Sequence, residues 1–390
     1  MDLKQRHFLP PTDHFFLFGP RGTGKSTWLR ACLPDAYIVD LLDDATWRQY
    51  LSDPDHIKAV VKANPEYTCF IIDEVQKAPK ILDSIHALIE ENKGHQFILT
   101  GSGARKLRRG GVNLLGGRAL LCHLHPFMAS ELGADFELSA ALKNGLVPLI
   151  AAATDPASKM AAYLRLYLNE EVQAEGLVRE IDSFARFLET ISFSHGAVMN
   201  VSNIARECRI SRKSIDNYLS VLEDLLLAYS LPVFTKRAKR AVTTHHKFYL
   251  FDTGVFQHLR PKGPLDSVPE IDGIALEGLV MQHLKAWSEY SGGNVQCFFW
   301  RTKSGSEIDF ILYGEGHFHA IEVKNAAHVN TKHLRALKTF CLDYPEARPL
   351  FLYRGKDKLI IDGIPCWPTD EFLRKLVPNH WPLTHTRGQP

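Results

Sequence analysis

Residues 19–27 read GPRGTGKST and directly follow the apolar run Phe15–Phe18. A strand that ends in a glycine-rich turn and leads into a helix directs several backbone N–H groups at one point, where polyphosphate fits. Glycine lets the backbone bend around the phosphates because it has no Cβ. The stretch therefore predicts a phosphate-binding loop for ATP. Its members are Gly19, Pro20, Arg21, Gly22, Thr23, Gly24, Lys25, Ser26 and Thr27.

Two side chains of this loop are suited to specific roles. Lys25 can reach the β- and γ-phosphates and assist catalysis, and the Ser26 hydroxyl can coordinate Mg²⁺. We therefore expect ATP and Mg²⁺ as cofactors of the amino-terminal part of the chain.

The composition is that of an ordinary globular protein. The chain has 390 residues, 45% of them apolar and 23% charged, which leaves room for two or three domains. The net charge is only +2, so a basic surface must be local. Its 7 cysteines lack CxxC pairing, which favours a reducing compartment and argues against structural zinc. No stretch approaches the length of a membrane span, and we expect a cytoplasmic protein without a membrane partner.

Hydrophobic patterning divides the chain into three parts. Residues 1–130 alternate short apolar strands with helical segments, which predicts an α/β domain with a parallel sheet between helices. Residues 131–250 are mainly helical, and residues 251–390 return to a mixed α/β pattern. The strands expected in the first part are Phe15–Phe18, Ala36–Val39, Thr68–Ile72, Gln96–Thr100 and Ala119–His123.

A second element of the phosphate site follows the apolar run Cys69–Ile72. Asp73 and Glu74 come next, so a buried strand would deliver two carboxylates to the carboxyl edge of the sheet, beside the loop. We expect Asp73 to hold Mg²⁺, directly or through water. We expect Glu74 to polarise the water that attacks the γ-phosphate.

Polar and basic residues follow the next predicted strand. Thr100 or Ser102 could lie near the γ-phosphate and act as a sensor, or could form an ordinary strand-end turn. Among the basic residues beyond them, Arg118 is the favoured arginine finger toward a neighbouring subunit, although DNA contact or simple solvation are alternatives. The other candidates are Arg105, Lys106, Arg108 and Arg109.

The string LTGSGARKLRRGGVNLLGGRA, residues 99–119, resembles prokaryotic AAA-type P-loop ATPases with a C-terminal domain of unknown function. That family lies near the signalling ATPases called STAND proteins. The resemblance continues through His125–Phe127 and Lys247–Val255, which reads KFYLFDTGV. It departs at residues 144–148, NGLVP, where such proteins more often have Gly-Gly-x-Pro. The resemblance implies a RecA/AAA-like sheet and ATP hydrolysis.

Residues 201–224 fit a helix-turn-helix. Ser202 and Ser211 can cap two short helices, each with an apolar inner face. Two such helices predict a winged-helix module that contacts DNA. The alternative is an interdomain or oligomer contact. The candidate DNA-binding residues are Arg212, Lys213, Asn217 and Tyr218 on the second helix, with Lys236 and Arg237 in the basic run Lys236–Arg240 as the wing.

The C-terminal part places acidic residues on neighbouring predicted strands. Asp309 lies on one strand, and Glu322 and Lys324 share a face of the next because they are two residues apart. Glu277, on the helical segment Ala275–Trp287, could supply a further ligand. Such oxygen ligands suit Mg²⁺ or Mn²⁺ and could support metal-assisted phosphodiester cleavage, with Lys324 orienting the attacking water.

This order of elements resembles the PD-(D/E)xK nuclease superfamily. Glu277, Asp309, Glu322 and Lys324 match its helix acid, strand acid and ExK pair. The elements expected after Lys324 agree with it: a helix over 331–342, a strand over 349–353 and a helix over 369–376. The resemblance implies a nuclease-like fold, whereas domains of this sort can lose activity and keep the scaffold.

Two main functions remain open at this stage. In the first, a DNA-associated ATPase controls a metal-dependent nuclease-like domain through its nucleotide state. In the second, ATP drives a regulatory switch whose nuclease-like domain only binds DNA or protein. A helper ATPase that loads a partner onto DNA is a third hypothesis, and assembly into a homo-oligomer is left open.

Overall fold

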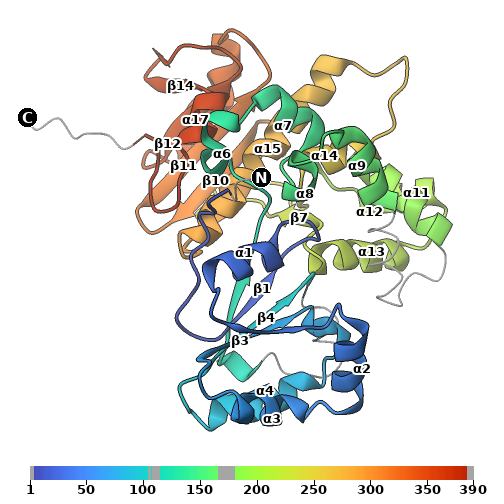
Figure 1. Cartoon of the computed structure of the whole chain (residues 1–390). Coiled ribbons are helices and arrows are strands. Elements are labelled where there is room, and N and C mark those ends of the chain that lie inside the picture. Colours follow the sequence, from blue (N-terminus) through green and yellow to red (C-terminus); the bar gives the residue numbers. More distant parts are fainter. Residues whose placement is uncertain (1–3, 104–106, 108–114, 166–180, 384–390) are drawn as a thin grey trace, which may run out of the picture. The chain divides into compact units, whose positions relative to one another are not determined.

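The computed structural model in Figure 1 describes residues 4–103, 107, 115–165 and 181–383. The chain forms two compact units. The first unit comprises Phe8–Pro126 and Ser220–Leu227, and the second comprises Met1–His7, Phe127–Leu219 and Ala228–Pro390. The predicted middle and C-terminal parts therefore share one unit, and each unit is described by itself below.

The first unit is built on a five-stranded sheet in the order β2-β3-β4-β1-β5, and every strand pair is parallel. This confirms the predicted α/β architecture. The strands are β1 Phe15–Phe18, β2 Tyr37–Asp40, β3 Cys69–Asp73, β4 Gln96–Gly101 and β5 Leu120–His123. The order puts β4 between β1 and β3, so the ends of these three strands lie side by side at the carboxyl edge. Ligands of open α/β sheets bind at this edge.

Helices cover both faces of this sheet (Figure 1). They are α1 Lys25–Cys32, α2 Asp44–Ser52, α3 His56–Ala63 and α4 Ile81–Glu90, with the 3₁₀ turns η1 Val75–Lys77 and η2 Leu115–Gly117. Side chains alternate along a strand, so Phe16 and Phe18 pack in one core with residues of α2, α3 and α4. The strand is fully buried, as its unbroken apolar run predicts.

A distant segment, Ser220–Leu227, completes the first unit. Leu225 is buried and Leu226 packs against the core of the sheet. The backbone comes so close that a Cβ on Gly103 would lie 2.2 Å from the carbonyl oxygen of Asp224. Nothing in the local sequence indicates this long-range contact.

The second unit begins with short helices and a small antiparallel sheet in the order β6-β8-β7. The helices are α6 Ala129–Leu132, η3 Gly133–Asp135, α7 Leu138–Asn144, α8 Pro148–Ala151, α9 Pro156–Tyr163, α11 Ile181–Ser192, α12 Val201–Cys208 and the first part of α13 Arg212–Asp224, whose end from Ser220 belongs to the first unit. The strands are β6 Ala197–Val198, β7 Ala228–Leu231 and β8 Lys247–Leu250. The two predicted helices over 201–224 are confirmed as α12 and α13.

A mixed six-stranded sheet in the order β13-β14-β12-β11-β10-β9 forms the rest of the second unit. Its strands are β9 Val295–Arg301, β10 Glu307–Gly314, β11 His317–Lys324, β12 Arg348–Tyr353, β13 Leu359–Ile361 and β14 Ile364–Pro368. Helices α14 Thr253–Leu259, α15 Val268–Tyr290, α16 Arg335–Asp343 (after the 3₁₀ turn η5 Thr331–Leu334) and α17 Thr369–Lys375 accompany them. None of the described helices is long and apolar enough to cross a membrane.

Candidate functional site

The phosphate loop connects β1 to α1 at the carboxyl edge of the parallel sheet. Gly22 and Gly24 have φ angles of +82° and +86°, which only glycine adopts without strain. The Lys25 side chain is buried, and its ammonium donates to the carbonyl oxygens of Gly19 at 2.7 Å and Pro20 at 3.3 Å. The Thr23 hydroxyl donates to the same Pro20 carbonyl at 2.8 Å. The loop is therefore a closed turn with its lysine folded against the backbone.

Position 19 requires glycine because a neighbouring backbone atom leaves no room for a side chain, and not because of its dihedral angles. A Cβ at this position would lie 2.5 Å from the carbonyl oxygen of Leu124, which follows β5. The neighbouring strand end thus leaves no room for any other residue at the start of the loop. Arg21 and Thr27 are exposed, and Ser26 is partly buried in the first turn of α1.

Asp73, Glu74 and Thr100 meet at the ends of β3 and β4. The Thr100 hydroxyl donates to Asp73 Oδ1, and its oxygen accepts the backbone N–H of Glu74 at 3.0 Å. Thr100 and Asp73 are both buried. Glu74 has a φ of +61°, a strained conformation for a non-glycine residue and one that clusters at functional sites. Thr100 therefore joins the two acids at the ends of β3 and β4, and their roles in ATP hydrolysis stay predictions.

Gln76 is a neighbour of this site that the sequence did not suggest. Its buried side-chain amide donates to Glu74 Oε2 and approaches Ser102 Oγ at 3.4 Å. A hydrogen bond to one carboxylate oxygen also orients the other, so Gln76 fixes the orientation of the Glu74 carboxylate. The 3₁₀ turn η1 holds Gln76 two residues after Glu74, and a glutamine at that spacing was the only available signal.

The residues at this edge fit Mg²⁺ bound together with ATP. Mg²⁺ keeps several waters and is usually held by one or two protein ligands plus the substrate phosphates. The Ser26 hydroxyl and the Asp73 carboxylate would be such ligands, and Thr100 holds the Asp73 carboxylate by a hydrogen bond.

The basic residues beyond Thr100 receive little structural support. Arg118 forms an ion pair with Glu90, at the end of α4 of the same unit. Its role as an arginine finger stays a prediction. Arg105, Lys106, Arg108 and Arg109 lie outside the described residues.

The candidate DNA-binding residues of α13 divide into two groups. Arg212, Lys213 and Asn217 are exposed. Tyr218 is buried instead, with its ring 5.1 Å from that of Phe184 and 5.3 Å from that of Phe187. The prediction that Tyr218 lies on the outer face of the helix is wrong. Its place in the helical repeat directs the aromatic side chain into the apolar core.

The predicted wing lies against the C-terminal sheet. Phe234 is buried and donates its backbone N–H to the Phe299 carbonyl of β9 at 2.7 Å. The Lys236 ammonium lies 4.2 Å from the centroid of the Tyr313 ring, and the Arg240 guanidinium pairs with the Asp343 carboxylate. Arg237 is exposed. Lys236 is therefore engaged by this sheet and Arg240 by the end of α16, which the charge pattern alone could not indicate.

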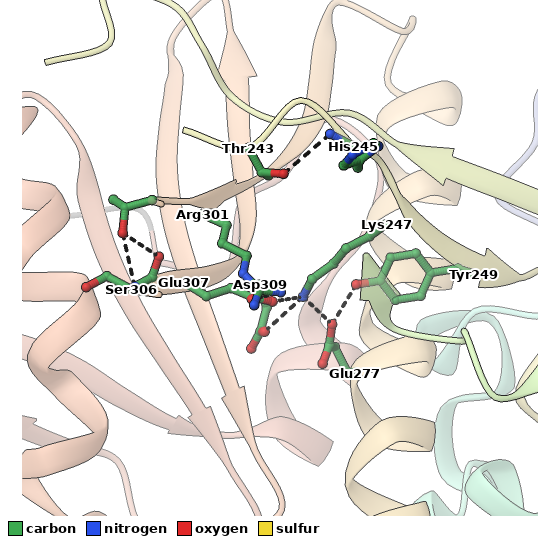
Figure 2. Close-up of polar contacts among 10 residues, drawn as sticks. Thr243, His245, Lys247, Tyr249, Glu277, Arg301, Ser306, Glu307 and Asp309 are labelled. Atoms are coloured by element: carbon green, nitrogen blue, oxygen red, sulfur yellow. Dashed lines mark hydrogen bonds and ion pairs between the residues drawn. The ribbon is translucent and has the colours of Figure 1, made fainter. Parts of the chain in front are cut away.

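Four carboxylates gather beside β8 in the second unit, and we call them the carboxylate cluster. They are Glu277 of α15, Glu307 and Asp309 of β10, and Glu322 of β11. Figure 2 shows Lys247 of β8 reaching into this cluster. Its ammonium lies 3.0 Å from Glu277 Oε1, 2.5 Å from Glu307 Oε1 and 3.5 Å from Asp309 Oδ1. Lys247, Glu307 and Tyr249, which donates to Glu277 Oε1 at 2.6 Å, are residues that the sequence did not assign to the site.

The predicted ExK pair completes the cluster. The Lys324 ammonium lies 2.7 Å from Glu322 Oε1, whereas the buried Glu322 Oε2 has no hydrogen-bond partner. Asp309 Oδ2 accepts the Val323 backbone N–H at 2.9 Å, which ties β10 to β11 between the two acids. The four residues predicted from the nuclease-like pattern are therefore brought together.

Burial and mutual repulsion set the charges of this cluster. Burial and the charge of Asp309 raise the pKa of Glu322 to about 8. Burial and Asp309 likewise raise the pKa of Glu277. Burial lowers the pKa of Lys247, but Glu277, Tyr249, Asp309 and Glu307 outweigh it, and the pKa lies well above its usual value. Lys247 is therefore a permanent cation.

A divalent metal does not fit the carboxylate cluster as it stands. The expected ligands were Glu277, Asp309 and Glu322, yet no group of three such side chains in the described part of the chain is arranged to hold a metal ion. The Lys247 ammonium contacts two of these three acids directly.

The sequence matches three known families along its length. Residues 12–133 match the family described as AAA domain. Residues 136–266 match a domain of unknown function, DUF8612, and residues 272–372 match another, DUF4143. No curated protein matches the chain.

Among solved structures, the chain is similar to a replication initiator DnaA bound to AMPPCP and single-stranded DNA. The identity is 13%, the TM-score is 0.27, and the match covers 54% of this chain and 82% of that one. It is also similar to AMPPCP-bound DnaA from Aquifex aeolicus, with 14% identity, a TM-score of 0.24, and coverage of 54% and 81%.

The family match and the geometry agree on the amino-terminal part. A parallel sheet carries the glycine-rich loop, the Asp73–Glu74 pair and Thr100 at one edge. The chain contains an AAA-type P-loop domain, a nucleotide-binding ATPase domain, over residues 12–133.

Proposed function

We propose that the chain is an ATP-driven switch that acts on DNA. ATP binds and is hydrolysed at the phosphate loop. Whether ATP or ADP is bound then controls the activity of the helix-turn-helix and the C-terminal domain. The observation that carries the proposal is the Thr100 hydroxyl, which joins the Asp73 carboxylate to the backbone of Glu74 beside the loop. Because Thr100 belongs to β4, a movement of the end of β4 would move both acids.

Each residue of the phosphate site has a part in this reaction. The loop N–H groups and the Lys25 ammonium bind the β- and γ-phosphates, for which Lys25 leaves the carbonyl oxygens of Gly19 and Pro20. Ser26 and Asp73 would hold Mg²⁺, which neutralises charge on the phosphates when bound. Glu74 orients the attacking water and accepts its proton, while Gln76 fixes the direction of the Glu74 carboxylate.

The segment Ser220–Leu227 supports a link from this site to the helix-turn-helix. It packs in the first unit beside Gly103, which follows Thr100 by three residues. It includes the end of α13, whose beginning carries the exposed Arg212 and Lys213. A shift at the end of β4 on hydrolysis therefore reaches a helix that bears the candidate DNA contacts.

The α12–α13 region supports DNA as the partner. The exposed Arg212 and Lys213 lie at the start of the second helix, and the exposed Asn217 lies further along it. Base and phosphate contacts arise on this helix in helix-turn-helix proteins. Arg212 and His245 also line a surface pocket of ≈ 350 Å³ at the start of α12. A backbone phosphate would fit there, because the Arg212 guanidinium and the N-terminus of α12 both favour an anion.

ATP turnover tests the first half of the proposal. Lys25→Ala removes the phosphate-binding cation, and Glu74→Gln keeps the shape of the base but cannot accept a proton. We expect both to lower ATP hydrolysis by about a hundredfold or more. Binding of a fluorescent ATP analogue should be weakened only in Lys25→Ala. The matched control is Lys143→Ala, an exposed lysine of α7. Hydrolysis that is unchanged in both variants would remove the ATPase role of this site.

DNA binding tests the second half. Fluorescence anisotropy of labelled DNA over a salt series should show weaker binding for Arg212→Ala and Lys213→Ala, with a salt slope lower by about 1 for each lost phosphate contact. The affinity should differ between ATP and ADP. The same affinity and slope for both variants, with Lys143→Ala as the control, would exclude α13 as a DNA contact.

The second candidate function is metal-dependent phosphodiester cleavage. It is favoured by Asp309, Glu322 and Lys324 on two paired strands, with Glu277 beside them. Supercoiled plasmid should then be cut with Mg²⁺ or Mn²⁺ by the wild type, but not by Asp309→Ala or Lys324→Ala. Equal cutting by all three proteins would assign the cleavage to a contaminant. We rank this function below the switch, because Lys247 contacts Glu277 and Asp309.

A further inference from the structure

Lys247 is placed as a cation at the centre of the carboxylate cluster. Figure 2 shows its side chain pointing from β8 toward Glu277 of α15 and the acids of β10. The side chain is only 1% exposed, so solvent does not compete for its ammonium. All three of its carboxylate contacts lie within 3.5 Å.

The oxygens that contact Lys247 have further partners. Glu277 Oε1 also accepts the Tyr249 hydroxyl at 2.6 Å, and Asp309 uses its other oxygen, Oδ2, to accept the Val323 N–H. Glu307 is shared with Arg301, whose guanidinium lies 3.4 Å from Glu307 Oε2. These contacts fix the carboxylates around an ammonium, whose hydrogen-bond donors they accept.

We propose that Lys247 is the resident cation of the carboxylate cluster and that it keeps divalent metal ions out. A metal ion bound by Glu277 and Asp309 would lie within contact distance of the ammonium, and like charges repel strongly at a buried position. A metal ion could bind only if the Lys247 ammonium moved away from its carboxylate partners. That movement would leave a buried cation without a counter-ion, which is costly. The chain itself therefore supplies a cation at the position that a metal ion would take.

This inference goes beyond ATP binding and DNA binding and does not depend on either. It concerns the ionic state of the second unit alone, without nucleotide or nucleic acid. It also gives acids that resemble a nuclease site a different role, as ionic contacts that join β8, β10 and α15. The Lys247 side chain alone then determines whether the carboxylate cluster can bind a metal ion.

Binding of Mn²⁺ to the full chain, without nucleotide, tests the proposal by the loss of the free-ion electron paramagnetic resonance signal. The wild type should bind no Mn²⁺ at this cluster. Lys247→Met keeps an apolar stem of similar length without the charge. It should gain one site that binds Mn²⁺ about a hundredfold or more tightly, because the charge repulsion is gone. The double variant Lys247→Met, Glu277→Gln should lose this site again. Lys303→Met, at an exposed lysine, is the matched control and should behave like the wild type.

Lysine acylation of the wild type, read by mass spectrometry, keeps the proposal testable if Lys247→Met does not fold. Lys247 should be protected relative to the exposed Lys303, and Mn²⁺ should not change this protection. The proposal is overturned if wild-type Mn²⁺ binding is lost in Glu277→Gln, if folded Lys247→Met gains no site, or if Mn²⁺ makes Lys247 reactive. DNA binding and ATP turnover play no part in these readouts, so their failure is a separate result.

Discussion

Replacement of Thr100 by valine removes one hydroxyl from the centre of the ATPase site and leaves the shape of the side chain. Thr100 is fully buried, at 0% exposure, and its hydroxyl bonds both Asp73 Oδ1 and the Glu74 N–H. The bond to a carboxylate contributes about 1.5–3 kcal/mol, and an unsatisfied buried N–H costs about 1–3 kcal/mol. Because the two groups relax together, we expect Thr100→Val to lower the free energy of unfolding by roughly 2–4 kcal/mol.

The catalytic effect of this substitution should be larger than its effect on binding. Without the bridge, Asp73 and Glu74 lose their common anchor, and a displacement of about 1 Å can cost roughly a hundredfold in rate. We expect kcat for ATP to fall by this order with little change in the affinity for a fluorescent ATP analogue. Urea unfolding measures the stability of the same proteins.

Thr100→Ser is the matched control, because it keeps the hydroxyl and loses only a methyl group. It should restore most of kcat. If Thr100→Val is destabilised as predicted but keeps kcat within about twofold of the wild type, the hydroxyl serves folding alone, and the reasoning about Asp73 and Glu74 is refuted.

Three further predictions follow from the contacts above. Gly19→Ala would put its Cβ 2.5 Å from the Leu124 carbonyl oxygen. The substitution should therefore weaken binding of an ATP analogue even if the chain stays folded. Unchanged binding would contradict this steric argument. Asp252 is fully buried, and burial raises its pKa from 3.8 to about 6 although backbone N–H groups of Leu146, Gly254 and Val255 oppose this. Its carboxyl therefore ionises at lower pH in the unfolded chain, so wild-type stability relative to Asp252→Asn should fall by about 2 kcal/mol as the pH rises from 4 to 6. A flat difference in urea unfolding would show that Asp252 does not titrate in this way. Phe234→Ala should destabilise the second unit by about 3–5 kcal/mol through the loss of its aromatic contacts, and chemical unfolding that stays within 1 kcal/mol of the wild type would exclude this anchoring role.

Local pattern was sufficient for the ATPase site. The loop, the acids after β3 and the threonine at the end of β4 each follow an apolar strand, and the carboxyl ends of parallel strands meet at one edge. The spacing alone thus predicts which residues converge. The contact between Thr100 and the two acids follows from strand order, which places β4 between β1 and β3.

Contacts between distant parts of the chain were beyond such reasoning. Lys247 opens the stretch KFYLFDTGV, residues 247–255, but it becomes a partner of Glu277 and Asp309 only because β8 lies beside α15 and β10. Tyr218 was misplaced because an aromatic residue at the edge of a helical apolar stripe can turn either way. The charges of the run Lys236–Arg240 also give no sign that the preceding Phe234 packs in the core of the C-terminal sheet.

The completion of the ATPase core by Ser220–Leu227 has a consequence for synthesis on the ribosome. The sheet strands emerge first, but Leu225 and Leu226 are translated about a hundred residues after β5, so the nascent domain exposes an uncovered apolar patch in the interval. A fragment that stops near residue 130 would keep that patch permanently. We expect such a fragment to aggregate, and a synthetic peptide spanning 218–228 to restore its solubility when added in trans.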